Sequence, residues 1–399
     1  MKPVTNCLLR HLRFNSQSIL LPIFLTPYSF FEYGVIIFVF SKMQKFTLFL
    51  FLLFCSGCTE LIHSPEVLEL PIPKSYTIKQ AESSPIIDGL ANEESWNSAD
   101  WTDLFIDIEG EQKPAPYYNT RVKMLWDDQF IYFYAEMEEE HIWGDITERD
   151  AVIFYNNDFE IFIKPNQFQP FYAEFEVNAL GTLWDLFLAR PYRRNGPILD
   201  HWDLNGTQVG IDINGTLNNP NDTDDSWSVE MAIPISPLKD IDRGSKLEVG
   251  SIWRINFSRV QWKHQITHGK YEKKTDSSGD LLSENNWVWT QQSDIDMHRP
   301  EHWGYVYFAD KQNSKIEEDP FLNEYQLLFH LYRKQLEWKV NHDRFSDNIR
   351  DFGGPDFIIN DIPLQGSVNS TKLGFEITVT NANKNSLTIN QNGFIITSS

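Results

Sequence analysis

Eight short segments rich in β-branched and aromatic residues constrain the fold of this chain more than any other feature. Turn residues such as Gly181, Gly206 and Pro220 punctuate them, and no stretch of helical periodicity separates them. This pattern predicts a mainly β protein, an antiparallel β-sandwich of immunoglobulin-like or jelly-roll-like type. The segments are residues 122–126, 130–137, 159–164, 172–178, 182–188, 227–233, 253–260 and 304–308.

The composition predicts a folded body and argues against nucleic-acid binding. Hydrophobic residues make up 41% of the 399 residues and aromatic residues 14%, which is enough apolar surface to fill a core. The formal net charge of −22 would repel phosphate backbones. We therefore expect no nucleic acid among the partners, whereas neutral or cationic ligands remain open.

The N-terminal part of the chain is expected to lie outside the folded protein. From Met43 a short basic start leads into the apolar run 46–54, and Ser-Gly precedes Cys58. This order resembles a bacterial lipoprotein signal, whose cysteine is lipidated. We interpret residues 1–42 as an upstream over-extension and 43–57 as the signal peptide, with an ordinary cleaved signal or a membrane anchor as the alternative. A lipid on Cys58 would make the protein an outer-membrane lipoprotein of the cell envelope.

Two further segments flank the predicted sandwich, which covers residues 82–310. Residues 58–81 contain several prolines and polar residues, a composition typical of a tether. After Pro320 the aromatic and leucine residues recur at helical spacing, and two strand-like segments, 373–380 and 386–397, follow. Residues 318–399 are therefore expected to form a small α+β appendage, one helix followed by a β-hairpin.

Six stretches of the predicted sandwich occur in a recognisable order. They are residues 86–89 with Trp96, 122–134, 158–163, 227–234, 253–259 and 298–304. Together they resemble a family 9 carbohydrate-binding module, a member of the DOMON-type β-sandwich group. The resemblance covers about residues 82–309 and implies an extracellular sandwich that binds oligo- or polysaccharides without cleaving them.

The chain departs from that family at the positions that usually clamp the sugar. Typical modules hold the ligand between two Trp side chains, and the matching positions here are Phe154 and Met297. The strand Arg of the family is replaced by Glu176, whereas Glu160 matches the family's strand Glu. The resemblance therefore implies a ligand-binding role for Glu160, whereas the departures leave the sugar preference open.

Aromatic and hydrogen-bonding residues in two loops and two strands form the predicted sugar site. The C–H faces of sugars stack on aromatic rings, and sugar hydroxyls bind carboxylates, amides and Arg. Phe154 or Tyr155 would stack on one side of a ring, and Trp287 or Trp289 would close the other. The predicted ligand-binding residues are Phe154, Tyr155, Asn157, Asp158, Glu160, Glu176, Trp287, Trp289, His298 and Arg299.

Other chemistries remain open from the sequence. Glu174 and Glu176 share one strand face, so either of them with Glu160 would offer the carboxyl pair of a glycosidase. A haem-binding redox module of DOMON type is a further alternative, with Met297 and His298 as neighbouring ligands. No cofactor is required by the sugar-binding interpretation. The acidic loop 218–225 is compatible with Ca²⁺, although a solvated turn is the simpler interpretation.

Overall fold

The computed structural model describes residues 64–194, 196–241, 247–312 and 318–398. The predicted over-extension, the signal peptide and Cys58 lie outside these residues. Within the described part of the chain, no helix has the length and apolar character that a membrane span requires.

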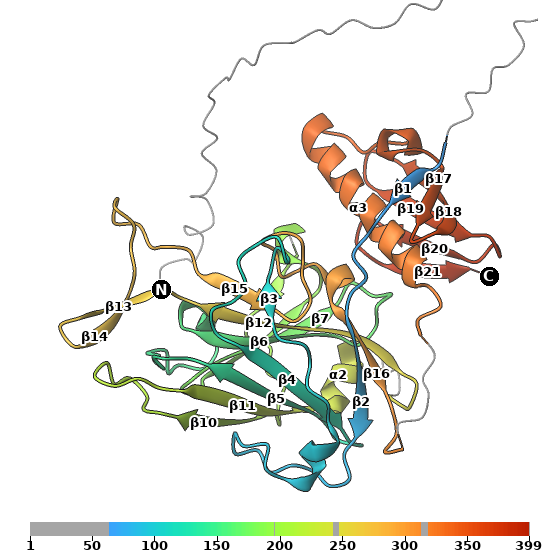
Figure 1. Cartoon of the computed structure of the whole chain (residues 1–399). Coiled ribbons are helices and arrows are strands. Elements are labelled where there is room, and N and C mark those ends of the chain that lie inside the picture. The colour runs from blue at the N-terminus through green and yellow to red at the C-terminus, as the bar shows by residue number, and fades with distance from the viewer. Residues whose placement is uncertain (1–63, 195, 242–246, 313–317, 399) are drawn as a thin grey trace, which may run out of the picture. The chain divides into compact units, whose positions relative to one another are not determined.

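The predicted β-sandwich is confirmed, and its two layers are shown in Figure 1. The first layer has the strand order β10–β11–β5–β4, and the second has the order β16–β12–β6–β7–β8–β9. β2 joins them, because it pairs in parallel with β16 at its start and with β4 at its end. β15 pairs with both β12 and β3. The bounds are β2 Ser75–Gln80, β3 Ile106–Asp107, β4 Thr120–Trp126, β5 Phe130–Glu138, β6 Asp158–Lys164, β7 Tyr172–Asn178, β8 Leu183–Leu188, β9 Ile198–Leu199, β10 Gln208–Asn214, β11 Ser226–Pro234, β12 Ile252–Gln261, β15 Asn285–Val288 and β16 Gly304–Phe308.

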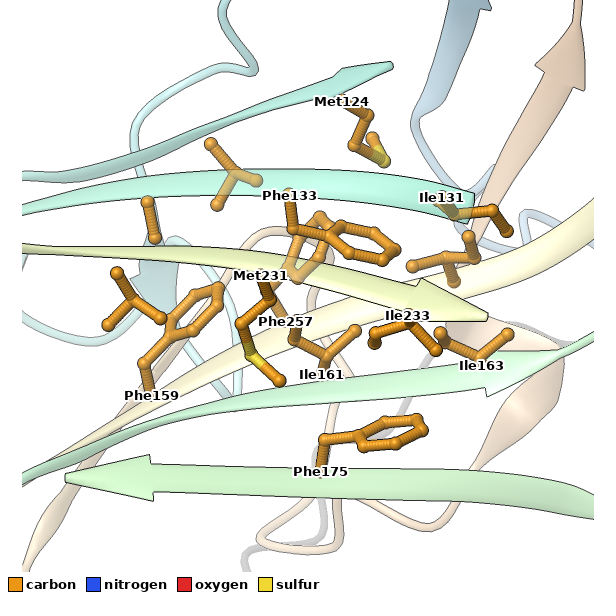
Figure 2. Packing of buried hydrophobic residues seen from close by; sticks show 14 of the residues in the cluster. Met124, Ile131, Phe133, Phe159, Ile161, Ile163, Phe175, Met231, Ile233 and Phe257 are labelled. Carbon is orange, nitrogen blue, oxygen red and sulfur yellow. The ribbon is translucent and has the colours of Figure 1, made fainter. Parts of the chain in front are cut away.

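The core lies between the two layers and follows from strand alternation. Every second residue of a strand points to the same face, so Phe159, Ile161 and Ile163 of β6 all enter the core. Figure 2 shows them with Phe175 of β7 and Phe257 of β12, packed against side chains from β4, β5 and β11. Because these apolar residues fill one face of β6 and β7, the polar residues between them must occupy the outer face of the second layer.

A helix and two-stranded hairpin complete this part of the chain. The helix α2 (Ile235–Ile241) directly follows β11, and Ile235 and Leu238 are buried in the same core. The hairpin of β13 (His264–Thr267) and β14 (Lys270–Lys273) follows β12. Short 3₁₀ turns lie at Glu94–Ser98, Ile153–Tyr155, Tyr192–Arg194, Pro300–His302 and Ile349–Phe352.

The C-terminal appendage contains the expected helix, but its sheet is larger than the predicted hairpin. The helix α3 (Leu322–His342) packs with a core that includes Tyr325 and Phe375. Polar residues in β18 hide its strand period in the sequence, which explains why it was not predicted. The sheet order is β1–β17–β18–β19–β20–β21, with bounds β1 Glu66–Leu68, β17 Asp356–Ile359, β18 Ile362–Ser370, β19 Phe375–Asn381, β20 Ser386–Asn390 and β21 Ile395–Ser398.

The tether predicted for residues 58–81 is largely structured where the chain is described. β1 pairs in parallel with β17 of the appendage, and β2 is a strand of the sandwich. Tyr76 and Ile78 are buried while their neighbours Ser75 and Thr77 are exposed, which is the alternation of a half-buried strand. Pro71 and Pro73 lie between the two strands, and Pro65 directly precedes β1.

Candidate functional site

A row of polar and aromatic side chains crosses four strands on the outer face of the second layer. In the β-sheet register, Glu160 of β6 lies opposite Ser258 of β12 on one side and opposite Glu176 of β7 on the other. Glu176 in turn lies opposite Trp184 of β8. Side chains directly opposite each other on neighbouring strands are within contact distance. The row Ser258–Glu160–Glu176–Trp184 therefore places carboxyls beside an indole ring.

A cavity of about 350 Å³ lies over this row. Its floor carries Glu160, Glu174 and Glu176, and Trp184 lies beside them. This volume is within the range of about 300–1,000 Å³ that is common for small-molecule sites. The remaining lining residues come from β6, β8, β12, β15 and the loops around them: Ile108, Phe154, Phe162, Leu186, Leu188, Tyr192, Arg193, Ile198, Val260, Glu284, Asn286, Ile295, Asp296, Met297 and His298.

The carboxyls of the floor are buried and crowd one another. Burial raises the pKa of Glu160 to about 7. The pKa of Glu176 is raised well above its usual range, first by burial and then by the negative charges of Glu160, Glu174 and Asp158. Burial and the charge of Glu160 likewise raise the pKa of Glu174. Carboxyls of this kind can hold protons near neutral pH, so the floor offers both donors and acceptors to a hydroxyl-rich ligand.

Four of the residues predicted from the sequence meet at this cavity: Phe154, Glu160, Glu176 and His298. Phe154 is held in place through its backbone, because its N–H donates to Glu176 Oε2 at 3.0 Å and its carbonyl accepts from Trp262 Nε1 at 2.8 Å. Tyr155 follows Phe154 on the 3₁₀ turn but does not line the cavity, and its side chain is 44% exposed.

The two tryptophans expected to close the site lie in the sandwich core instead. Trp287 is 2% exposed and Trp289 is 1% exposed, and neither lines the cavity. The ring of Trp289 packs 5.9 Å from that of Phe257. β15 turns Trp287 inward and leaves Asn286, one residue earlier, to face the cavity. The structure therefore does not bring either indole to the ligand space.

Asn157 and Arg299, two of the other predicted residues, have structural partners next to the cavity. Asn157 Nδ2 donates to Glu139 at 2.6 Å, and its Oδ1 accepts from the backbone N–H of Trp262 at 2.8 Å. Arg299 Nη1 donates to the carbonyl of Gln292 at 2.9 Å and so ties together the loop that carries His298. Asp158 is fully buried beside Glu160 and Glu176 without lining the cavity.

His298 lies in an aromatic pocket at the cavity wall. Its Nδ1 lies 2.6 Å from the hydroxyl of Tyr172, and the ring of Tyr192 stands 4.4 Å away in an edge-on arrangement. Burial, with a smaller contribution from Arg193, lowers the pKa of His298 to about 3. The imidazole is therefore neutral at physiological pH and serves as a hydrogen-bonding wall residue rather than a positive charge.

Sequence reasoning missed Trp184, Tyr192, Glu284 and Asp296 among the lining residues. Trp184 had a usable signal: it lies in the predicted strand 182–188 and alternates with the inward-facing Leu183 and Asp185. The other three lie in loops or at strand ends, where no periodic pattern indicates which way a side chain points.

Residues 87–185 match the family described as "Carbohydrate family 9 binding domain-like". The resemblance inferred from the sequence motifs is thus confirmed, and the matched region contains Glu160, Glu176 and Trp184. No curated protein matches the chain.

The solved structures that match this chain are distant in sequence. A family 9 carbohydrate-binding module from Caldicellulosiruptor kristjanssonii in complex with cellotriose aligns over 62% of this chain and 100% of its own, at 16% identity and a TM-score of 0.38. The glucose complex of a family 9 module from the same organism covers 61% and 97%, at 18% identity and a TM-score of 0.37. A protein from Bacteroides uniformis covers 59% and 99%, at 16% identity and a TM-score of 0.43. At these TM-scores the alignments carry no weight for the position of binding residues.

Proposed function

We propose that the cavity over the second layer binds a carbohydrate without cleaving it. The observation that carries this proposal is the row Glu160–Glu176–Trp184, which places hydrogen-bonding carboxyls next to an indole face on the floor of a cavity of about 350 Å³. Sugars need this combination, because their rings present apolar C–H faces and polar hydroxyl edges. The match of residues 87–185 to a carbohydrate-binding family supports the same conclusion.

The roles of the residues follow from their positions. Trp184 is half-buried on β8 and would stack on a sugar ring, with Phe154 contributing a second aromatic surface. Glu160, Glu174 and Glu176 would bind hydroxyls from below. Asn286 and Asp296 line the same cavity and would add polar contacts to the ligand. A cavity of this size accepts a short oligosaccharide or the end of a longer chain.

A glycan array on the chain from residue 59 onward tests the proposal. Hits would then be measured by calorimetry with three variants, Trp184→Ala, Glu174→Gln and Tyr155→Ala. Trp184→Ala and Glu174→Gln are expected to weaken binding, whereas Tyr155→Ala is the matched control because its ring lies next to the site without lining the cavity. An array without hits across plant, algal and host glycans would contradict the function, and equal binding by Trp184→Ala would contradict the site.

We also propose that the protein acts at the bacterial cell envelope as an outer-membrane lipoprotein in glycan capture or degradation. The support is in the sequence, where an apolar run and Ser-Gly precede Cys58. Replacing Cys58 with Ala should release the protein from membranes and abolish labelling by a radioactive fatty acid. Unchanged fractionation of Cys58→Ala would contradict the anchor and leave the sugar site untouched.

A further inference from the structure

Three buried carboxyls come together at one edge of the cavity floor without forming an ion pair with any cation of the described residues, although the charge of Lys273 acts on Asp158 from beyond ion-pair distance. One oxygen from each of Asp158, Glu160 and Glu176 lies within 4.8 Å of the other two. The three residues are between 0% and 7% exposed. Among the described residues, no Lys, Arg or His forms an ion pair with any of them. Buried carboxylates in proteins are ordinarily paired or coordinate a metal.

Unused oxygen atoms surround this cluster. Both carboxyl oxygens of Asp158 are buried and accept no hydrogen bond of regular geometry. The hydroxyl of Ser258 on β12 is also buried and makes no hydrogen bond of regular geometry; its interaction is with the carboxyl of Glu160, which lies directly opposite it. A buried polar atom without a partner is costly, so several of them around one point indicate a missing ligand.

A second carboxylate triad in the same chain has its negative charge neutralised by a side chain of the protein itself. Oxygens of Asp150, Asp185 and Asp203 lie within the same 4.8 Å of one another. Arg149 forms ion pairs with all three, at 3.7 Å to Asp150 and 3.0 Å to Asp203 and with Asp185 as the third partner. Asp185 also accepts the backbone N–H of Leu204 at 2.6 Å. In the described part of the chain, no residue forms ion pairs with Asp158, Glu160 and Glu176 as Arg149 does with the other triad.

We propose that Asp158, Glu160 and Glu176 bind a Ca²⁺ ion at the edge of the cavity floor. Ca²⁺ takes carboxylate and other hard oxygen ligands at about 2.3–2.6 Å, so two ligands of one ion lie no more than about 5.2 Å apart. The three carboxyl oxygens, all within 4.8 Å of one another, satisfy this limit. Mg²⁺ requires shorter bonds and a stricter octahedron. The cluster has no imidazole or thiolate that would favour zinc.

The ion would face the cavity, since Glu160 and Glu176 both line it. Its remaining coordination positions would then be available to Ser258 or to hydroxyls of a bound carbohydrate. This last step rests on the proposed function, whereas binding of the ion itself does not.

Calorimetry and thermal melting of metal-free protein with CaCl₂ test the site, using the chain from residue 59 onward. One Ca²⁺ per chain and a rise in melting temperature are expected. Asp158→Asn should weaken Ca²⁺ binding about tenfold or more, since affinity follows the number of charged ligands. Asp203→Asn is the matched control from the other triad, where Arg149 already supplies the positive charge, and it should bind Ca²⁺ as the wild type does.

A second readout keeps the test decisive if Asp158→Asn folds poorly. Tb³⁺ replaces Ca²⁺ in oxygen sites, and its luminescence would be sensitised by Trp184, which lies opposite Glu176. Excitation of tryptophan should give Tb³⁺ emission in the wild type, and Trp184→Phe should reduce the emission while Ca²⁺ binding persists. Absence of Ca²⁺ binding by folded wild-type protein at millimolar CaCl₂, or equal binding by folded Asp158→Asn, would overturn the proposal. Carbohydrate binding unchanged by a Ca²⁺ chelator would refute only the step that joins ion and sugar.

Discussion

Replacing Trp289 with Ala discriminates sharply between a core residue and a ligand-binding one. The indole is 1% exposed and packs beside Phe257. β16 passes so close that a Cβ atom on Gly304 would collide with the indole ring. Truncation of a large aromatic in such a packed position leaves a cavity and costs about 3–5 kcal/mol. Against a typical total of about 5–15 kcal/mol, this is a large share of the stability.

The magnitude can be checked with a double-mutant cycle measured by urea denaturation. Gly304→Ala alone should also destabilise strongly, because its methyl group has no space beside Trp289. In the Trp289→Ala background the same methyl group enters the vacated space, so the two losses should not add. We expect a coupling energy of about 1–3 kcal/mol, typical of residues in direct contact.

A different result for Trp289→Ala would contradict the placement of Trp289 in the core. If Trp289→Ala unfolds at the wild-type midpoint and loses carbohydrate binding, Trp289 contacts the ligand and its placement in the core is incorrect. If it is less stable but still binds the ligand at low denaturant, the assignment of the cavity to the outer face of the second layer is supported.

Three further predictions concern the site and its supports. Trp184→Ala should weaken carbohydrate binding about three- to tenfold, the loss expected for a stacking contact of about 0.5–1.5 kcal/mol, as measured by calorimetry. The pKa of His298 is about 3 in the folded protein and near 6.5 in the unfolded chain. Its contribution to the free energy of unfolding is therefore fully present above pH 6.5 and is about 2 kcal/mol smaller at pH 5. His298→Gln should lack this part of the pH dependence of unfolding. Arg259→Met should cost about 3–5 kcal/mol in urea denaturation, since it leaves the buried carboxylate of Glu139 without its ion pair. Arg121→Met, which breaks an exposed pair, should cost less than about 1 kcal/mol, and equal losses in the two variants would contradict the distinction.

The sandwich was predictable because its central strands carry an unambiguous pattern. β6 and β7 alternate apolar residues such as Ile161 and Phe175 with carboxyl residues such as Glu160 and Glu174. The apolar residues must be buried in a core, and because side chains alternate along a strand, the carboxyl residues then point to the opposite face of the sheet. The strands that were missed are short or polar, such as β9 with two residues and β10 with its mixed composition. Their positions depend on pairing partners far away in sequence.

The same rule explains why Trp287 of β15 and Trp289, directly after it, could not be placed from the sequence. In Trp287-Val288-Trp289 all three side chains are apolar, so the segment has no polar face to mark the solvent side. Only the register with β12, where Trp287 lies opposite Arg259, determines that the indoles enter the core and that Asn286 faces the cavity. A one-residue shift of β15 would reverse every one of these assignments. Pattern alone therefore identifies the site where faces differ in chemistry, and it fails where both faces are apolar, because there the choice is made by tertiary packing.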